Sequence, residues 1–416
     1  MKIDLSRFLG MCSCGKEHAI TVDEIIIESG AVKELSRVAA DYQHPVIVCD
    51  KNTKAAAYPY MKDYFETYEV AEMRGDNIHA DNCFTAIADE MISREADLLI
   101  AVGAGTIHDL TRYTAYQRKI PFISVPTAAS VDGFVSVIAA MTWHGMKKTL
   151  PAVAPIYVLA DTDIFGKAPY RLTASGISDL MGKYTALLDW RVCHVLFDEY
   201  FCKTIYDLEM EAVQEVEKVL NNIKKGEPEC MEKLMYALIL SGLAMQMTGN
   251  SRPASGAEHH VSHLWEMAII NEPVDALHGE KVSIGLVFVT EYYEKIRRAI
   301  KNNTCRIVDG RAYETELLQQ TFGAKDKYEE VLQENNPNLM EDINLADLEA
   351  KLPLIAKELE KLPDAGELKK KLADAGCVTT MEEIGLDAAL KDLTLRLCPY
   401  VRRRLTLLRL SKLMTL

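Results

Sequence analysis

The chain has 416 residues, of which 49% are hydrophobic, and its 47 lysines and arginines against 61 aspartates and glutamates give a net charge of −14. Such a length allows a large core and predicts two domains. The acidic balance argues against nucleic acid and anionic membranes as main partners, and no apolar run reaches the roughly 18 residues of a membrane span. The ten cysteines are scattered and no secretory signal is evident, so we expect reduced thiols in a cytoplasmic protein.

The first 168 residues alternate apolar runs with amphipathic stretches. The strands expected here are 20–28, 46–49, 98–102, 121–125 and 156–160, the helices are 31–42, 54–64, 82–94 and one ending at residue 116, and a hairpin joins 136–142 to 146–149. Strands and helices that alternate at this spacing predict a doubly wound, Rossmann-like α/β domain. Ligands of such domains bind at the carboxyl ends of the strands.

Two strand ends carry candidate cofactor residues. The run 98–102 ends in Gly103-Ala104-Gly105-Thr106 and leads into a helix. This predicts a phosphate cradle, although the third glycine of the dinucleotide pattern is missing and many such turns use glycine only for shape. Asp50 ends the strand at 46–49, where it either accepts hydrogen bonds from an adenine ribose, which would favour NAD, or caps the next helix.

From residue 169 onward the sequence shows almost no strand pattern. The expected helices are 171–197, 209–224, 231–247, 254–269, 281–298, 314–322, 326–334, 345–361, 382–391 and 393 to the end. We therefore predict a first domain over residues 1–168 and an all-helical second domain over residues 169–416.

The stretch 251–285 holds four of the ten histidines. If residues 255–269 are helical, His259 and His263 lie one turn apart on one face, and His260 is turned roughly 100° away. With His278 from the next segment they could form a transition-metal site. A solvated polar helix with capping histidines is the alternative.

Asp179 is a candidate ligand beside those histidines. It follows the small residues 174–176, which would let another helix or a ligand approach closely. One carboxylate with two imidazoles leaves open positions on a metal, as catalytic sites require. A surface ion pair with Lys183, one turn on, is the alternative.

A second short cluster lies near the start of the chain. Cys12, Cys14 and His18 stand in the sequence CSCGKEH. Thiolates and imidazole are zinc ligands. The cluster is either a second metal site or part of an N-terminal hairpin.

Five motifs in order carry a resemblance to a known family. They are VGAGTIHD (102–109), SVPTAASVDGF (124–134), SGISDLMGKYTA (175–186), SRPASGAEHHVSH (251–263) and LHGEKVSIG (277–285). On these motifs the chain resembles the iron-containing alcohol dehydrogenase/dehydroquinate synthase-like superfamily over residues 20–300. Within it, the chain is most similar to the sn-glycerol-1-phosphate dehydrogenases, in particular their AraM-like bacterial branch.

The resemblance implies a role for each motif residue. It places the dinucleotide pyrophosphate on Gly103, Ala104, Gly105, Thr106 and Asp109, and the nicotinamide side on Thr127, Ala128, Ser130 and Ser136. It gives substrate hydroxyls to Asp132, a divalent metal, zinc or nickel, to Asp179, His259 and His278, and the substrate to His263, so that Asp179 and His263 are the catalytic residues. His260 aligns as a ligand almost as well as His259. Iron enzymes of the wider family carry a histidine where this chain has Lys183, which argues against their four-ligand site.

The implied activity is reversible reduction of dihydroxyacetone phosphate to sn-glycerol 1-phosphate with NADH or NADPH, a step of phospholipid metabolism. A glycerol or polyol dehydrogenase of the same fold and a dehydroquinate-synthase-like lyase are the alternatives, and the lyase would be expected to carry more lysines and arginines in its cleft. A non-catalytic binding protein is a third reading. Lys183, Arg252 and Lys281 are the cations nearest the motifs for the substrate phosphate. The family predicts a homodimer.

Overall fold

The chain folds into two compact units. The computed structural model describes residues 3–75 and 77–416. Unit 1 comprises Met1–Leu180 and Thr204–Ser251, and unit 2 comprises Met181–Lys203 and Arg252–Leu416. The chain therefore divides differently from the predicted boundary at residues 168/169. The reason is that two long helices, α8 (Lys203–Glu217) and α9 (Pro228–Thr248), return to pack within unit 1.

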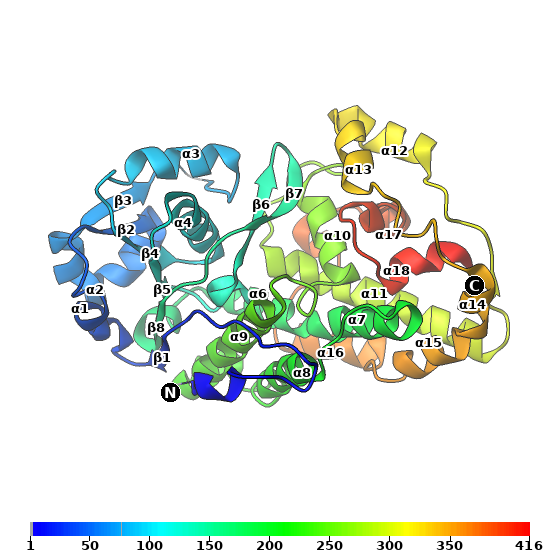
Figure 1. Cartoon of the computed structure of the whole chain (residues 1–416), viewed down its shortest axis with the longest axis horizontal. Coiled ribbons are helices and arrows are strands. Elements are labelled where there is room, and N and C mark those ends of the chain that lie inside the picture. Colours follow the sequence, from blue (N-terminus) through cyan, green and yellow to red (C-terminus); the bar gives the residue numbers. More distant parts are fainter. Residues whose placement is uncertain (1–2, 76) are drawn as a thin grey trace. The chain divides into compact units, whose positions relative to one another are not determined.

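Unit 1 is built on one six-stranded parallel sheet (Figure 1). Its strands, in spatial order, are β1 (Glu24–Glu28), β8 (Tyr157–Asp161), β5 (Phe122–Pro126), β4 (Leu98–Gly103), β2 (Pro45–Asp50) and β3 (Glu69–Met73). The predicted doubly wound α/β fold is thus confirmed. Strand β3 was missed, because this edge strand alternates polar with apolar residues and has no continuous apolar run.

The side chains of the apolar central strands pack into a core on each face of the sheet. Ile47 and Cys49 pack on the face covered by α1 (Leu35–Val38) and α2 (Lys51–Thr67), whereas Val46 and Val48 pack on the other face. That second face is covered by α3 (Asn82–Met91) and α4 (Gly105–Arg118), as Figure 1 shows. Since side chains alternate along a strand, a strand covered on both faces must be apolar throughout.

The connections define where a ligand would bind. From β2 the chain goes through α2 to β3, toward one edge of the sheet, and from β4 it goes through α4 to β5, toward the other. Neighbouring strands whose connections leave in opposite directions open a crevice at their carboxyl ends. This switch point lies between β2 and β4.

Two further predictions concern the hairpin and the helix that follows it. The expected hairpin is present as β6 (Ile138–Trp143) and β7 (Met146–Pro151), with φ of 50° at His144 and 78° at Gly145. Two left-handed central residues match the twist of a hairpin. The single long helix expected over 171–197 is wrong: α6 (Tyr170–Met181) and α7 (Lys183–Phe197) are separated at Gly182, a poor helix former.

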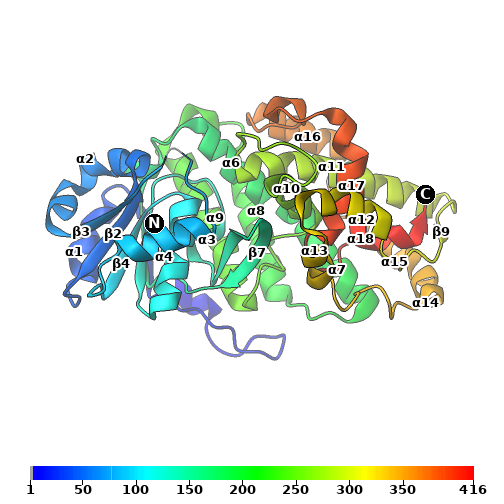
Figure 2. The same cartoon turned by 90° about the horizontal axis from the view of Figure 1, so that it is seen from above.

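Unit 2 is helical, as predicted (Figure 2). Besides α7 it contains α10 (Ala257–Glu266), α11 (His278–Lys301), α12 (Thr315–Thr321), α13 (Tyr328–Glu334), α14 (Leu345–Ala350), α15 (Leu352–Leu359), α16 (Ala365–Asp374), α17 (Lys391–Leu397) and α18 (Leu407–Leu410), and a short antiparallel pair, β9 (Arg306–Ile307) with β10 (Met414–Thr415). No helix among residues 3–75 and 77–416 is long and apolar enough to cross a membrane.

The tail of unit 2 departs from the predicted helices. The helix expected over 345–361 is two helices, because Pro353 lacks an N–H and starts α15 instead of continuing α14. The helix expected over 382–391 is two single 3₁₀ turns separated by Gly385, whose φ is 79°. Helix α16 was not predicted.

Helices α10 and α11 lie directly against each other (Figure 2). A Cβ atom on Gly285 of α11 would stand 2.5 Å from the main-chain oxygen of Glu258 in α10. Glycine at this position therefore allows the two helix backbones to touch. The close approach brings the start of α11 beside the middle of α10.

Candidate functional site

The turn from β4 to α4 has the features of an anion site in unit 1. A Cβ atom on Gly103 would stand 2.4 Å from Cβ of Ile107, so glycine lets the helix pack against the strand end. Ala104 is the residue before α4 and makes no side-chain capping bond. The first N–H groups of this 14-residue helix and its positive dipole end therefore suit a phosphate.

Asp50 caps a helix. Its Oδ1 accepts hydrogen bonds from the main-chain N–H groups of Asn52 at 2.7 Å and Thr53 at 3.0 Å, at the start of α2. The capping role left open by the sequence is thus observed. A ribose contact would have to use the second carboxylate oxygen and stays a prediction.

The loop after β5 is clamped between two helices. A Cβ atom on Gly176 of α6 would stand 2.1 Å from the oxygen of Ala129, and one on Gly242 of α9 would stand 2.9 Å from the oxygen of Asp132. The Ser175 hydroxyl donates to the oxygen of Ser130 at 3.1 Å. The small residues of α6 therefore admit the backbone of this loop, whereas the sequence predicted the close approach of another helix or a ligand.

The other predicted cofactor residues lie on the loop after β5 and on α4. Thr127 donates its main-chain N–H to the oxygen of Gly103 at 2.9 Å, which joins the loop to the β4–α4 turn. Ala128 and Ser130 are buried beside it. Asp109, in α4, lies 3.6 Å from Arg112. The predicted residues thus share the carboxyl edge of the sheet.

Arg112 was not predicted, yet it holds the far end of the loop. Its buried guanidinium donates to the main-chain oxygens of Ser136 at 2.8 Å, Phe134 at 3.1 Å and Ile138 at 3.2 Å. Burial lowers its pKa from the ordinary value. The local sequence does not mark Arg112, because its burial is evident only in the folded chain.

Asp132 and Asp179 meet in unit 1. The main-chain N–H of Asp132 donates to Oδ2 of Asp179 at 3.0 Å, and Oδ2 of Asp132 accepts from the hydroxyl of Ser241 at 2.8 Å. Ser241 comes from α9 and was not predicted. Two carboxylates assigned to substrate and metal therefore lie together, each oriented by a specific donor.

Three of the four histidines form a cluster in unit 2. The ring centroids are 5.2 Å apart for His259 and His278, 5.9 Å for His259 and His263, and 5.7 Å for His263 and His278. His259 and His263 lie one turn apart on α10, as predicted, and His278 is the first residue of α11. We call this set the histidine cluster.

His260 lies outside the histidine cluster. It is fully buried, and neither ring nitrogen has a hydrogen-bond partner within the described ranges. Burial and the charges of Arg404, Arg402 and Arg409 hold its pKa well below 6.5. His260 is therefore a neutral core residue, whereas His259 belongs to the histidine cluster.

Two of the clustered imidazoles are oriented by carboxylates. Nδ1 of His259 lies 2.7 Å from Oε1 of Glu258, and Nδ1 of His278 lies 2.6 Å from Oε1 of Glu266. An ionised carboxylate only accepts, so each Nδ1 donates its proton and each Nε2 keeps its lone pair. Metal-binding imidazoles are commonly held in this way.

Glu258 is held in its charged form. Burial acts to raise its pKa, but hydrogen bonds from His259, from the Thr185 hydroxyl and from the N–H of Gly256 lower it overall. An ionised Glu258 fixes the tautomer of His259.

His263 is held in the opposite tautomer. Nε of Arg402 lies 3.3 Å from Nδ1 of His263. A guanidinium only donates, so Nδ1 is the acceptor and the neutral ring carries its proton on Nε2. His263 is therefore set up as a proton donor, in contrast to the ligand tautomer of His259 and His278.

The cations named from the sequence have internal roles. Arg252 pairs with Glu199 through contacts of 2.7 and 2.9 Å, and Lys281 donates to the oxygen of Ala276 at 2.7 Å. Lys183 is fully buried. Arg402 touches the histidine cluster, and burial lowers its pKa to about 10, so it stays charged at neutral pH.

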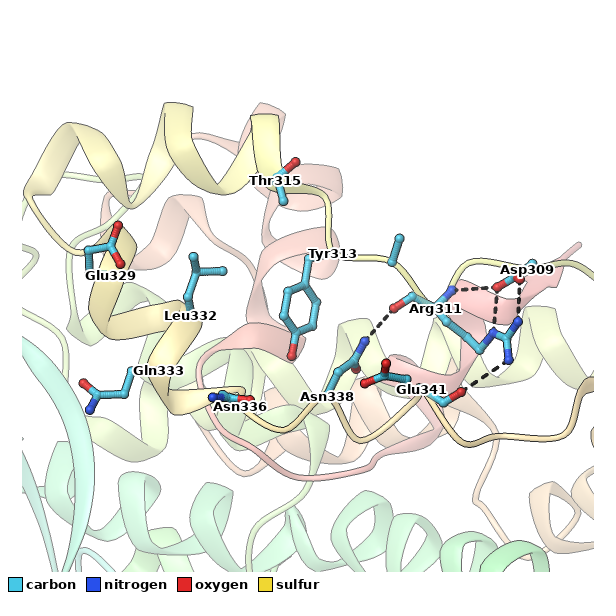
Figure 3. A pocket seen from close by; sticks show the side chains of 11 residues that line it. Asp309, Arg311, Tyr313, Thr315, Glu329, Leu332, Gln333, Asn336, Asn338 and Glu341 are labelled. Atoms are coloured by element: carbon cyan, nitrogen blue, oxygen red, sulfur yellow. Dashed lines mark hydrogen bonds and ion pairs between the residues drawn. The ribbon is translucent and has the colours of Figure 1, made fainter.

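A pocket in the tail of unit 2 is a weaker candidate (Figure 3). Its arginine, Arg311, is bound to Asp309 by contacts of 2.6 and 2.8 Å. Asn338 donates to the oxygen of Arg311 at 2.8 Å. These groups satisfy one another, so the pocket offers no poised chemistry comparable to that of the histidine cluster.

Comparisons with known proteins identify the family of the chain. The family model for iron-containing alcohol dehydrogenase matches residues 26–169. A glycerol-1-phosphate dehydrogenase, NAD(P)+, of Geobacillus stearothermophilus is 33% identical over 92% of this chain and 91% of its own. A protein of the same name from Halalkalibacterium halodurans is 33% identical over 97% and 95%.

Solved structures share the fold at low identity. An archaeal alcohol dehydrogenase from a Red Sea brine pool has a TM-score of 0.62 at 15% identity, with 92% of each chain covered. A protein described as a putative alcohol dehydrogenase, from Ralstonia eutropha, has a TM-score of 0.62 at 14% identity, with 95% of this chain and 97% of its own covered.

Proposed function

Because the chain belongs to the iron-containing alcohol dehydrogenases and, within them, to the glycerol-1-phosphate dehydrogenase family, we propose that it reversibly reduces dihydroxyacetone phosphate to sn-glycerol 1-phosphate with NAD(P)H. The observation that carries this proposal is the identity of 33% over 91% of a relative of that name. The family resemblance inferred from the motifs is confirmed. The polyol dehydrogenase and lyase alternatives are not favoured, since the curated relatives bear the phosphate-substrate name.

The cofactor is assigned to unit 1. We place its pyrophosphate at Gly103–Asp109, because the uncapped start of α4 lies at the switch point of the sheet. We place the nicotinamide side at Thr127–Ser136, the loop held by α6, α9 and Arg112. When bound, the cofactor supplies the hydride, and this loop fixes the position from which it leaves.

The metal is assigned to Asp179, His259 and His278, with zinc or nickel as the ion. The tautomers of His259 and His278 support this choice, because both present an Nε2 lone pair. The donor set of one oxygen and two nitrogens suits a borderline transition metal with positions left for substrate. When bound, such an ion polarises a carbonyl oxygen and stabilises negative charge on it.

The chain's own residues divide the remaining work. His263 donates the proton on Nε2 to the substrate oxygen, and Arg402 keeps that proton on Nε2 by occupying Nδ1. Asp132, oriented by Ser241, accepts hydrogen bonds from the substrate hydroxyl. Arg402 is a positioning residue here, and its charge also favours an anionic substrate near the cluster.

A cytoplasmic location and a homodimer belong to this proposal as predictions. The location is supported by the acidic composition and the scattered cysteines. The dimer is supported by the family alone.

One experiment tests the function. The purified protein is stripped with a chelator, restored with zinc or nickel, and assayed by NADH and NADPH oxidation with dihydroxyacetone phosphate and with dihydroxyacetone. We expect activity to vanish on stripping, to return with metal, and to be far higher with the phosphorylated ketone. Activity that ignores the chelator contradicts the metal assignment, and equal kcat/KM for the two ketones contradicts the phosphate substrate.

A further inference from the structure

We propose that Cys12, Cys14 and His18 bind a second divalent metal ion of the thiophilic class typified by Zn²⁺, with Cys202 as the fourth ligand. This site is separate from the histidine cluster and does not depend on the proposed activity. Its role is structural, since three thiolates and one imidazole fill all four positions of a tetrahedral zinc ion and leave none for a substrate.

The local fold brings the first two thiols into one turn. The N–H of Gly15 donates to the oxygen of Cys12 at 2.9 Å, and the N–H of Cys12 donates to the oxygen of Lys16 at 2.9 Å. Gly15 has a φ of 81°, a conformation that glycine adopts without strain. Met11 and Glu17 then pair as an antiparallel bridge. The sequence offered a hairpin and a metal site as alternatives. The hairpin is present, and the proposed ligands lie on it and just after it.

The ligand atoms stand at the spacing that zinc requires. Sγ of Cys14 lies 3.4 Å from Nε2 of His18. The ligand atoms of Cys12, Cys14 and His18 all lie within 4.8 Å of one another. Tetrahedral zinc with ordinary bond lengths separates a sulfur from a nitrogen by about 3.6 Å. A simple S–H···N hydrogen bond would account for the Cys14–His18 contact, whereas a bound ion would also account for Cys12 lying beside both.

The tautomer of His18 supports metal binding. Its Nδ1 lies 2.8 Å from the main-chain oxygen of Met247, at the end of α9, and the ring is buried. A carbonyl only accepts, so Nδ1 carries the proton and Nε2 directs its lone pair toward the thiols. A backbone carbonyl on the remote nitrogen is a common partner of a metal-bound imidazole.

The fourth ligand follows from chain connectivity. Sγ of Cys12 lies 3.3 Å from the hydroxyl of Thr204, within unit 1. Cys202 precedes Thr204 by two residues, so the two Cα atoms are at most about 7 Å apart. When metal binding ionises Cys12, the Thr204 hydroxyl turns to donate to the thiolate.

The site would fasten the N-terminal segment to the helices of unit 1. His18 contacts the end of α9, Cys12 contacts the start of α8, and Arg7 pairs with Glu211 of α8 at 2.8 Å. In Figure 1 the N-terminal segment, in dark blue, runs beside these two helices. All ten cysteines lie in the described part of the chain and none forms a disulfide there, so an ion would be the cross-link of this segment.

The test counts metal in the full-length protein. Zinc and nickel per chain are measured by mass spectrometry in the wild type and in Cys14→Ser, His18→Ala, His259→Ala and Cys83→Ser. We expect two ions in the wild type and in the control Cys83→Ser, whose cysteine is exposed and outside the cluster. Cys14→Ser and His18→Ala should each lose one ion, and His259→Ala should lose the other.

A second readout guards against misfolded variants. The stripped wild type is titrated with Co²⁺, and the thiolate-to-cobalt charge-transfer absorption is followed. It should saturate at one equivalent, persist in His259→Ala and vanish in Cys14→Ser. A wild type with no thiolate band, or a Cys14→Ser protein that keeps both ions, overturns the proposal. If the band is present while dihydroxyacetone phosphate is not reduced, the activity fails and this site stands.

Discussion

The predicted site residues of the two units are held in place in different ways. In unit 1 the turn and the loop predicted to bind the cofactor are positioned by small residues such as Gly103, Gly176 and Ser175, which let neighbouring elements touch. In unit 2 the predicted site residues are imidazoles, and their tautomers are set by partners such as Glu258 and Arg402. Substitutions in unit 1 should therefore act through packing, whereas those in unit 2 should act through protons and charge.

The sharpest test of this contrast is His259→Ala. Removing a ligand should empty the proposed metal site and lower kcat/KM by on the order of 10³-fold or more, which is about 4 kcal/mol of transition-state stabilisation. Thermal stability should change much less. His260→Ala is the matched control, because its ring lies outside the histidine cluster. If His260→Ala alone loses the active-site metal, the assignment of the ligand to His259 is wrong.

The corresponding test in unit 1 is Gly176→Ala. The new Cβ would stand 2.1 Å from the oxygen of Ala129, a backbone atom that cannot swing away. The free energy of unfolding should fall by about 1–3 kcal/mol, and the KM for NADH should rise as the loop shifts. Gly133→Ala is the control, since nothing lies within 4 Å of its added Cβ. Equal denaturation midpoints for the two variants would contradict the packing argument.

The contrast also explains what the sequence could predict. Apolar runs located β2, β4, β5 and β8, because full burial leaves its mark on consecutive residues. The residues that orient the site left no local mark. Ser241 acts on Asp132 from 109 positions away and Arg402 acts on His263 from 139 positions away, so only the folded chain pairs them.

Some of the predicted site residues, by comparison, could be recognised because they lie at the first or last position of a strand or helix. Gly103 and Asp50 end strands, and His278 begins a helix. The sequence did not predict that α8 and α9 belong to unit 1. Their place there depends on contacts between distant residues, such as that of Ser241 in α9 with Asp132 in the loop after β5. The tail was read least well, since its helices are short and broken by residues such as Pro353 and Gly385.

A smaller effect is expected from Glu266→Gln. The amide can still accept from Nδ1 of His278, but it lacks the negative charge that makes the imidazole a stronger ligand. Metal affinity should fall by roughly 10–100-fold, with kcat preserved at saturating metal. Competition with a chromophoric chelator measures the affinity. An unchanged affinity would show that the carboxylate only positions the ring.

The smallest effect is a pH dependence that separates a structural imidazole from the clustered ones. Both ring nitrogens of His108, in unit 1, form hydrogen bonds within the protein. Nε2 lies 2.8 Å from the Ser124 hydroxyl, and Nδ1 lies 3.0 Å from the main-chain oxygen of Ala104. Burial, with Arg112 adding to it, lowers its pKa to about 3. Below about pH 6.5, His108 therefore binds a proton in the unfolded chain but not in the folded chain. The free energy of unfolding falls as the pH falls through that value.

This dependence gives a measurable difference between wild type and His108→Gln. Between pH 7.5 and pH 5.5 the wild type should lose about 1.4 kcal/mol of stability through His108, and the variant should not. The stability gap between the two proteins, measured by denaturant unfolding at each pH, should therefore shrink by that amount on acidification. The histidine cluster is common to both proteins, so its own titration cancels in the comparison. If the difference in stability between the two proteins does not change with pH, His108 takes up its proton in the folded state as well. The β4–α4 turn would then accommodate a buried charge, contrary to the lowered pKa of His108.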